Sequence, residues 1–521
     1  MCFNKDKVFM KISSLHIYNN STPYFFNLKS DVRPRTEFAN NTELPTSFMG
    51  REKVLTDGLK SLKQDVAQFP KDIEYRKTLL KEIGIEPSKF YKLRSIIGTE
   101  EIKKILSELS TSPEYYTAGE NYENTINGMF RANLHIHTTA SDGFFSTQEL
   151  LDKGAEYADH VKNLNPTAKN PFVIAITDHD CVEATKEAVK IIESNPLKYK
   201  NLRVILGAEM TTFDNVATDI VDYPTNAHIL VYGLNPFDKK FQSFIESYKE
   251  QKFAISDKMT SKANYLFEKS FGRSLNFSTE EVKAFSNQFR KGQTGAFNHI
   301  DKYINVKFLL GEIILKNPNI TSALKKNNFP TKVDELLQEM IKYYFVLNRN
   351  NYTPSAESLV TSFVSEKTKL PAKEIETLIS SKLESPDIKE FKKSLKENFE
   401  EFKITLHPKR RYVPNYKALY SALSNQENTL IGIAHPLDYV SKISSEKDKY
   451  LFLTKLFDKF KKEFKDKGLF SETYYQSYMK DTKNFNENEV TIPFLQALNK
   501  THDMYNSGGV DCHRNNLFKR Y

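Results

Sequence analysis

Apolar runs of strand length alternate with amphipathic stretches in two separate parts of the chain. In the first part the strand-like runs are ANLHIH, FVIAIT, RVILGAEM and AHILVYGL, and STQELLDKGAEYADHV and CVEATKEAVKIIES have helical periodicity. In the second part NTLIGIAHP, SETYYQSY and GGVDCH are strand-like, and DKYLFLTKLFDKFKKEF and FLQALNKTHDMY are helical. Strands that alternate with helices predict an α/β fold, in which a parallel sheet or barrel is covered by helices.

Two further segments complete the predicted domain organisation. Residues 1–125 form an N-terminal extension, irregular at first and then helical, because Leu55, Leu59 and Leu62 recur at helical spacing. Residues 235–427 are rich in lysine and glutamate with mostly helical periodicity, which indicates a large helical insertion domain. The barrel is therefore expected in two pieces, residues 131–234 and 428–521.

Composition narrows the class of protein. The 521 residues predict roughly two to four domains, and a net charge of +9 is small for this length. Such a charge permits an anionic substrate without requiring nucleic acid. Three widely spaced cysteines argue against a disulfide framework, and no run resembles a signal peptide or a membrane span. We therefore expect a cytoplasmic protein without a membrane partner.

The motif NLHIHTTASDG contains the first candidate metal ligands. His135 and His137 lie two residues apart on a predicted strand, so both side chains project from one face and can share one metal ion. Asp142 follows in a turn beside Ser141 and Gly143, where its carboxylate can reach a second ion.

Two further strands end in polar residues. The run FVIAIT leads into Asp178, His179 and Asp180, at the position where parallel sheets place their sites. Either aspartate can orient the imidazole of His179, and Asp180 is also a candidate helix cap for the stretch that follows. Glu209 lies at the predicted end of the next strand and His228 at the start of the one after it. A glutamate carboxylate has two oxygens and can bridge two cations.

The last candidates are His435, in IGIAHP, and the pair Asp511 and His513, in GGVDCH. The two-residue spacing of this pair repeats the argument that alternate residues of a strand share one face. Cys512 lies between them and is expected to point the opposite way, as a small buried residue.

The motifs HIHTTASDG, TDHD, GAE, AHP and DCH, in this order, resemble those of the PHP (polymerase and histidinol phosphatase) family. The resemblance implies a distorted (β/α)7 barrel with up to three metal ions at the ends of its strands. It implies one ion held by His135, His137, Glu209 and Asp511, a second by Glu209, His228 and His435, and a third by Asp142, His179 and His513. Asn133 and Val510 depart from the usual motif residues, but neither is a metal ligand.

The insertion resembles that of the branch with nucleoside 3',5'-bisphosphate phosphatases and a 5'-to-3' exoribonuclease. FNHI at His299 and RRYVP, which begins with Arg410 and Arg411, carry this likeness, so these three residues are candidate contacts for substrate phosphates. The arginines could equally form a solvated basic run.

The resulting hypothesis is a metal-dependent phosphoric ester hydrolase that acts on a nucleotide or another small phosphorylated metabolite. Two or three divalent ions of manganese, zinc or iron suit the donor set. Three alternatives stay open: an exonuclease acting on RNA or DNA ends, a phosphomonoesterase of the histidinol phosphatase kind, and a barrel that binds a protein partner.

Overall fold

The strand-like runs of both parts of the chain join one eight-stranded sheet. The structure is a computed structural model. It describes residues 67–111, 132–221, 225–282, 296–349, 355–405, 414–441, 443–475 and 485–513. All of these residues belong to one compact unit, Ser61–Tyr521. The strands are β1 (Ile96–Ile97), β2 (Ala132–Ile136), β3 (Phe172–Ile176), β4 (Leu202–Asp214), β5 (Thr225–Tyr232), β6 (Leu430–Ile433), β7 (Gly468–Tyr475) and β8 (Tyr505–Gly509). Strands β2 to β8 pair in chain order, and β1 pairs with β4.

The two ends of this strand path approach each other. Ile136 and Cys512 form an isolated parallel bridge between the end of β2 and the residues after β8. The backbone N–H of Cys512 donates to the carbonyl of His135 at 3.1 Å, and the N–H of His137 donates to the carbonyl of Cys512 at 3.3 Å. The sheet is therefore a nearly closed barrel, and the beginning and end of the barrel sequence meet at one point.

Strand β5 runs antiparallel to both of its neighbours, β4 and β6, whereas the other pairs are parallel. The prediction of a parallel sheet is thus wrong at β5, because residues 215–224 are too few for the crossover that two parallel strands need. As a consequence, the first residues of β5 lie at the same end of the barrel as the carboxyl ends of the other strands.

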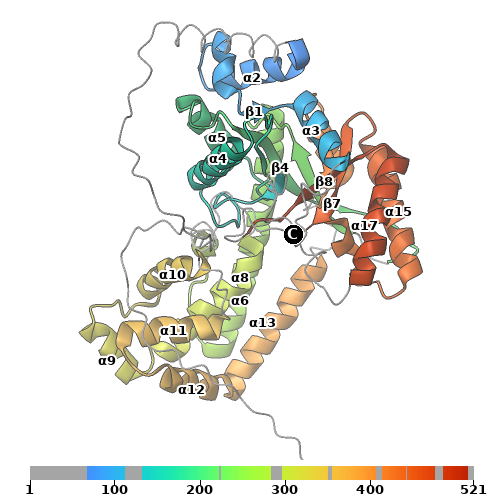
Figure 1. The fold of residues 1–521 in the computed structure, drawn as a ribbon. Coiled ribbons are helices and arrows are strands. Elements are labelled where there is room, and N and C mark those ends of the chain that lie inside the picture. Colours follow the sequence, from blue (N-terminus) through green and yellow to red (C-terminus); the bar gives the residue numbers. More distant parts are fainter. Residues whose placement is uncertain are drawn as a thin grey trace, which may run out of the picture. The chain divides into compact units, whose positions relative to one another are not determined.

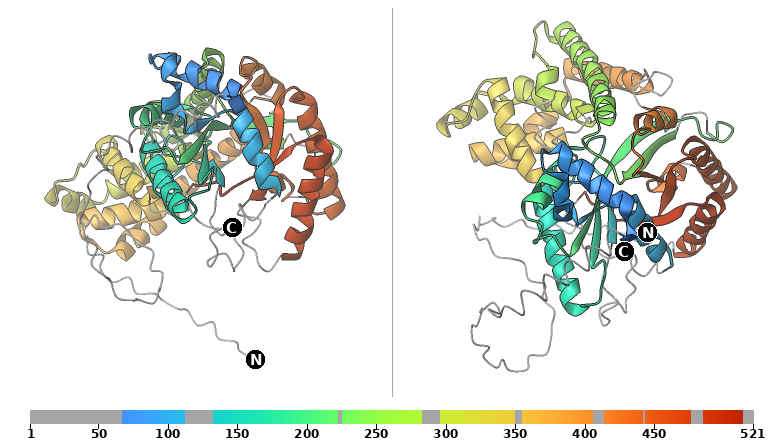
Figure 2. Two further views of the ribbon diagram at one scale, coloured as in Figure 1. Left: turned by 45° about the horizontal axis from the view of Figure 1, so that its top comes forward. Right: turned by 90° about the horizontal axis from the view of Figure 1, so that it is seen from above.

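Helices cover the outside of the sheet (Figure 1). Helices α4 and α5 lie on one side of the sheet and α15 and α17 on the opposite side, as both views of Figure 2 show. The elements around the barrel are α2 (Pro70–Glu82), η1 (Pro87–Leu93), α3 (Thr99–Thr111), α4 (Thr147–Leu164), α5 (Glu183–Ser194), α14 (Tyr416–Ala422), η7 (Pro436–Val440), α15 (Glu446–Glu463) and α17 (Phe485–His502). None of the helices in the described ranges combines the length and the apolarity needed to cross a lipid bilayer.

The interior of the barrel is filled by side chains. Strands β2, β3 and β6 are buried along their whole length, which explains their continuous apolar runs. Tyr232 of β5 stacks on Phe470 of β7 with 4.2 Å between ring centroids, and its hydroxyl donates to the carbonyl of Leu134 in β2. The barrel is therefore a packed core, and a site must lie at one of its ends.

The elements that the structure describes in the predicted insertion are all helical, and turns and loops join them. Its elements are α6 (Lys239–Phe271), α8 (Ala296–Leu309), the π-helical turn η5 (Leu310–Ile314), α9 (Pro318–Lys326), α10 (Val333–Arg349), α11 (Ala356–Thr368), α12 (Ala372–Leu383) and α13 (Pro386–Thr405). These helices bury a hydrophobic cluster of their own, in which the rings of Phe267, Phe308 and Phe391 contact one another. The insertion thus has a separate core.

The helical region before the barrel contributes the short strand β1, which helical spacing did not predict. Asp72 of α2 is fully buried, and its carboxylate joins α2 to α3. One of its carboxylate oxygens accepts the backbone N–H of Glu100 at 3.1 Å, and the other accepts that of Glu101 at 2.9 Å. These donors belong to the first turn of α3, which has no helical partners for them.

We expect Asp72→Ala to lower the free energy of unfolding by about 1–2 kcal/mol, the usual cost of losing a carboxylate that caps a helix. Urea denaturation followed by circular dichroism measures the change. Asp72→Asn keeps one side-chain oxygen as an acceptor and should cost less. Equal stability of Asp72→Ala and the unaltered protein would contradict this role.

Candidate metal centre

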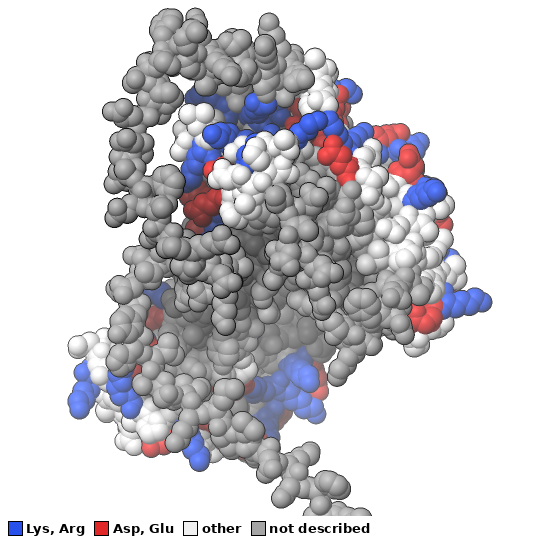
Figure 3. Space-filling model, viewed as in Figure 1, with Lys and Arg blue, Asp and Glu red and all other residues white. Residues whose placement is uncertain are grey.

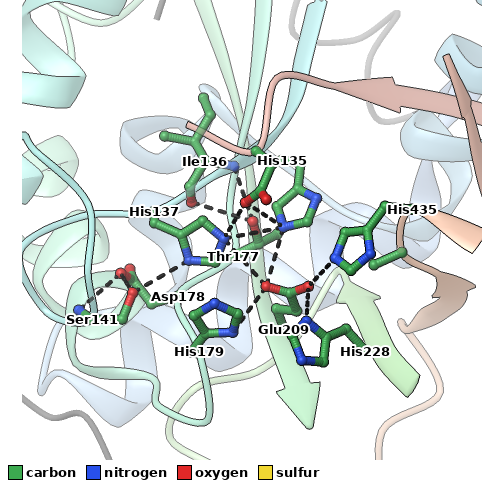
Figure 4. Close-up of polar contacts among 12 residues, drawn as sticks. His135, Ile136, His137, Ser141, Thr177, Asp178, His179, Glu209, His228 and His435 are labelled. Atoms are coloured by element: carbon green, nitrogen blue, oxygen red, sulfur yellow. Dashed lines mark hydrogen bonds and ion pairs between the residues drawn. The ribbon is translucent and has the colours of Figure 1, made fainter. Parts of the chain in front are cut away.

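Nine predicted side chains meet at the end of the barrel that carries the carboxyl ends of its parallel strands. Figure 4 labels six of them, His135, His137, His179, Glu209, His228 and His435. They come from β2 or the loop after it (His135, His137, Asp142), the loop after β3 (His179), β4 (Glu209), the first half of β5 (His228), the residue two after β6 (His435) and the turn after β8 (Asp511, His513). His228 reaches this end from the start of its strand because β5 is antiparallel.

The carboxylate of Glu209 lies at the centre of the group and is fully buried. Its Oε1 lies 3.0 Å from Nδ1 of His228 and 3.2 Å from Nε2 of His435. Its Oε2 faces three further imidazoles, 3.2 Å from Nε2 of His135, 3.2 Å from Nε2 of His137 and 2.9 Å from Nδ1 of His179. Glu209 is therefore placed to bridge two cations. We predicted it at a strand end, but β4 continues to Asp214 because β5 pairs with it.

The predicted ligands Asp511 and His513 lie close together because of a turn, and not because they alternate along a strand as expected. Asp511 and His513 follow β8, and Asp511 has a φ of +47°, so they do not alternate along a strand. The N–H of His513 instead donates to the carbonyl of Asp511 at 2.9 Å in a tight turn, which brings Nδ1 of His513 within 3.0 Å of Asp511 Oδ1. Cys512 between them is buried in the hydrophobic cluster, as predicted.

The hydrogen bonds around His135 and His137 fit a bound cation. Nδ1 of His135 faces both oxygens of Glu472 at 3.2 Å, and Nδ1 of His137 faces the Oγ of Ser141 at 3.3 Å. The Ser141 hydroxyl donates to Asp178 at 2.6 Å, so its oxygen is free to accept from His137. Both imidazoles then carry hydrogen on Nδ1 and direct lone pairs from their Nε2 atoms, which lie only 3.1 Å apart. A proton or a metal ion between them relieves this repulsion.

Two buried carboxylate oxygens also require a cation beside them. Oε2 of Glu209 and Oδ1 of Asp511 receive no hydrogen bond from the described residues, although imidazole nitrogens surround both. A buried anionic oxygen without a hydrogen bond is costly unless a cation lies next to it. Imidazole and carboxylate together form a donor set typical of manganese, zinc and iron sites. The residues present therefore fit divalent metal ions.

Ligand atoms within 4.8 Å of one another define three overlapping groups. The group His135, His137, Glu209 and Asp511 coincides with the first predicted ligand set. A second group contains the predicted Asp142, His179 and His513 and adds His137. The third joins Glu209 and His228 to His179, whereas the predicted ligand His435 lies outside this group and faces the same Glu209 oxygen as His228, Oε1.

Electrostatics of the group follow from burial and from the proximity of opposite charges. Burial raises the pKa of Glu209, but the imidazoles of His179, His135 and His228 together hold it well below its usual value. Burial lowers the pKa of His179, but the carboxylates of Glu209 and Asp142 raise it to about 9. The pKa of His135 is likewise raised well above its usual value, against burial, by Glu472, Glu209 and Asp511. Without a metal ion, protons take the place of cations in this group.

Of the two aspartates predicted to orient His179, Asp178 bonds to the loop after β2 and Asp180 bonds to β4. Asp178 accepts the backbone N–H of Thr138 at 2.7 Å and both the N–H and the hydroxyl of Ser141, so it shapes the loop after β2. Asp180 accepts the N–H and the hydroxyl of Thr211 in β4 at 2.8 and 2.9 Å. It does not cap α5, because that helix begins at Glu183 with Val182 as its N-cap and without a side-chain cap.

Three residues at the site were not predicted. Glu472 of β7 contacts His135, and the hydroxyl of Tyr475 in the same strand donates to Asp511 at 3.0 Å. Tyr439 of η7 accepts the backbone N–H of His228 at 2.9 Å. For Glu472 the sequence offered one signal. It is the single acidic residue in the strand-like run SETYYQSY, and it has no basic neighbour in that run.

The predicted phosphate contacts fall outside what the structure describes. Arg410 and Arg411 lie in residues 406–413, beyond the described ranges, and the side chain of His299 in α8 is also not described. Their proposed role stays a prediction.

Comparison with known proteins leaves the activity open. No family model matches the sequence, and no curated protein matches it. A proposed metal-dependent phosphoesterase from Bifidobacterium adolescentis is 13% identical over 73% of this chain and 87% of its own, with a TM-score of 0.34. An amidohydrolase from Chromobacterium violaceum, solved with bound sulfate and without metal, is 14% identical over 75% of this chain and 90% of its own, with a TM-score of 0.35.

We expect metal binding to release protons and to strengthen as the pH rises. His135 and His179 have raised pKa values and are protonated in the metal-free protein at neutral pH, and the pKa of His435 is raised as well, whereas a metal ligand must be a neutral imidazole. Affinity should therefore increase up to about pH 9, the pKa of His179, and fall as the pH is lowered. Calorimetric titration with Mn²⁺ in buffers of different ionisation enthalpy counts the released protons. Binding that releases none and is equally tight at pH 6 and pH 9 would contradict this picture.

Proposed function

We propose that this chain is a PHP-type, metal-dependent phosphoric ester hydrolase with two or three divalent ions at the end of its barrel. The observation that carries the proposal is the buried Glu209, whose two oxygens face separate sets of imidazoles. A single carboxylate shared in this way supports adjacent ions rather than one isolated ion. The five motifs of the family resemblance supply eight of the nine side chains, and the ninth, His228, comes from the run AHILVYGL.

The candidate ligands differ in how far their side chains are exposed to solvent. The side chains of His135, His137 and Glu209 are fully buried, so they can hold ions in a fixed place. Those of His228 and His513 are 24% and 29% exposed and mark the side from which substrate enters. Bound divalent ions would lower the pKa of a water molecule, bind phosphate oxygens and offset charge on the leaving oxygen. Phosphate esters, which are anionic, suit such a site.

The proposed substrate is a nucleotide or another small phosphorylated metabolite. Support comes from the likeness of the insertion to the nucleotide-acting branch, through FNHI and RRYVP. On the face shown in Figure 3, both basic and acidic side chains are visible among the described residues, and the net charge of +9 is small for a chain of this length. An exonuclease is thus the second candidate, distinguished by RNA affinity that weakens steeply with salt.

Purified protein should contain manganese, zinc or iron and should release phosphate from mononucleotides or nucleoside bisphosphates. Elemental analysis by mass spectrometry identifies the metal, and a panel of nucleotides, sugar phosphates, histidinol phosphate and short RNA identifies the ester. Removal of metal by a chelator should abolish hydrolysis, and added metal should restore it. Full activity in metal-free protein would refute the proposal. If the chain hydrolyses none of these esters but binds another protein, a binding module is favoured instead.

We expect His137→Asn to lower kcat/KM for the preferred ester by more than about 100-fold, because losing a ligand should exceed the loss from outer partners. His502→Asn is the matched control. His502 is buried in α17, where its ring nitrogens lie 2.8 Å from the carbonyl of Leu498 and 2.9 Å from Asp458, away from the metal centre. If circular dichroism shows that both variants are folded and their activities are equal, His137 has no role in the mechanism.

A further inference from the structure

Glu472 is a buried carboxylate at the metal centre that belongs to none of the family motifs. Its side chain is 1% exposed and lies within β7. In the described part of the chain its partners are the imidazole of His135 and the backbone of His435, and no lysine or arginine pairs with it. A buried carboxylate needs polar partners to compensate its removal from water, and the two histidines provide them.

The contact with His135 determines which nitrogen of that ring is available. Both oxygens of Glu472 lie 3.2 Å from Nδ1 of His135, and an ionised carboxylate can only accept a hydrogen bond. The neutral ring therefore carries its hydrogen on Nδ1 and presents the lone pair of Nε2. That atom lies 3.2 Å from Glu209 and 3.4 Å from Asp511, inside the group of candidate ligands.

The same carboxylate also holds the backbone of His435. Oε2 of Glu472 accepts the N–H of His435 at 2.9 Å. His435 has a φ of +26°, a conformation that is unfavourable for a residue with a Cβ and persists only where neighbours stabilise it. In that conformation its Nε2 reaches Glu209 Oε1 at 3.2 Å, and its ring lies nearly parallel to that of His135, with 5.9 Å between centroids.

Glu472 thus connects two ligands that face different oxygens of Glu209, since His135 lies at Oε2 and His435 at Oε1. Strand β8 leaves room for this arrangement. A Cβ on Gly509 would lie 2.4 Å from the Cβ of His135 and 2.9 Å from Oε1 of Glu472, so any larger residue there would displace the pair.

We propose that Glu472 is a positioning residue that sets the Nδ1–H tautomer of His135 and fixes the backbone of His435, and so determines the affinity of the centre for metal. The inference rests on the proposed function, because it requires that the centre bind metal. Glu472 acts through the two histidines, without contacting the substrate.

Glu472→Gln tests the role of the carboxylate at nearly constant size. A glutamine oxygen can still accept the N–H of His435, but the side chain is neutral and brings an amide donor toward Nδ1 of His135. We expect the affinity of metal-free protein for Mn²⁺ to fall about 10–100-fold, the range found for outer partners of metal ligands. Electron paramagnetic resonance of free Mn²⁺ measures the affinity, and circular dichroism verifies the fold.

The matched control is Glu312→Gln, which neutralises a buried carboxylate in the insertion, where Arg273 and Lys316 pair with it. Its Mn²⁺ affinity should equal that of the unaltered protein. Glu472→Gln that folds and binds Mn²⁺ as tightly as the control overturns the inference. An unaltered protein that binds none of Mn²⁺, Zn²⁺ and Fe²⁺ refutes the proposed function instead.

If Glu472→Gln does not fold, the tautomer can be measured in the unaltered protein. Long-range ¹⁵N correlation spectra of histidine-labelled, Zn²⁺-loaded protein report which ring nitrogen carries hydrogen, and His135→Asn identifies the signal of His135. Hydrogen on Nδ1 of His135 supports the role of Glu472, and hydrogen on Nε2 overturns it.

Discussion

The burial of one carboxylate, Glu209, among five imidazoles is the interaction on which this site depends. Removing a carboxylate from water costs several kcal/mol unless nearby groups compensate it. Here the compensating groups come from β2, β5 and the loops after β2, β3 and β6, so they can surround Glu209 only when the sheet curves into a barrel. Closure of the barrel and formation of the site are therefore one requirement.

Strained backbone accumulates at the same end of the barrel. Asp180, His435 and Asp511 all have positive φ values, and each lies shortly after a strand. Local hydrogen bonds hold the first two, from the N–H of Asp180 to the carbonyl of Glu209 and from the N–H of His435 to Glu472. Such conformations persist where the surrounding structure stabilises them and are common at functional sites. They direct each chain segment inward as soon as its strand ends.

Sequence pattern predicted the barrel strands, the helices between them and the candidate ligands, because continuous apolar runs that end in histidine or acid are visible in one dimension. It did not predict the direction of β5, since β5 is buried on both faces and so carries the same continuous apolar run as the parallel strands. Glu472 was missed for a related reason: a lone glutamate in a strand usually faces solvent, and only the spatial meeting of β7 with β2 shows that it is buried. The turn that joins Asp511 to His513 likewise depends on a backbone conformation that residue spacing does not encode.

The long helix α6 has a consequence for how this chain can be divided. Its first turns pack in the cluster around β5 and β6 through Phe241 and Ile245, while Met259 and Phe267 belong to the core of the insertion. Helix α14 also contributes Tyr416 and Leu419 to the barrel cluster. Excision of residues 235–427 would therefore strip apolar cover from the barrel wall. A minimal catalytic fragment would have to retain both the start of α6 and the whole of α14, with a short linker spliced between them.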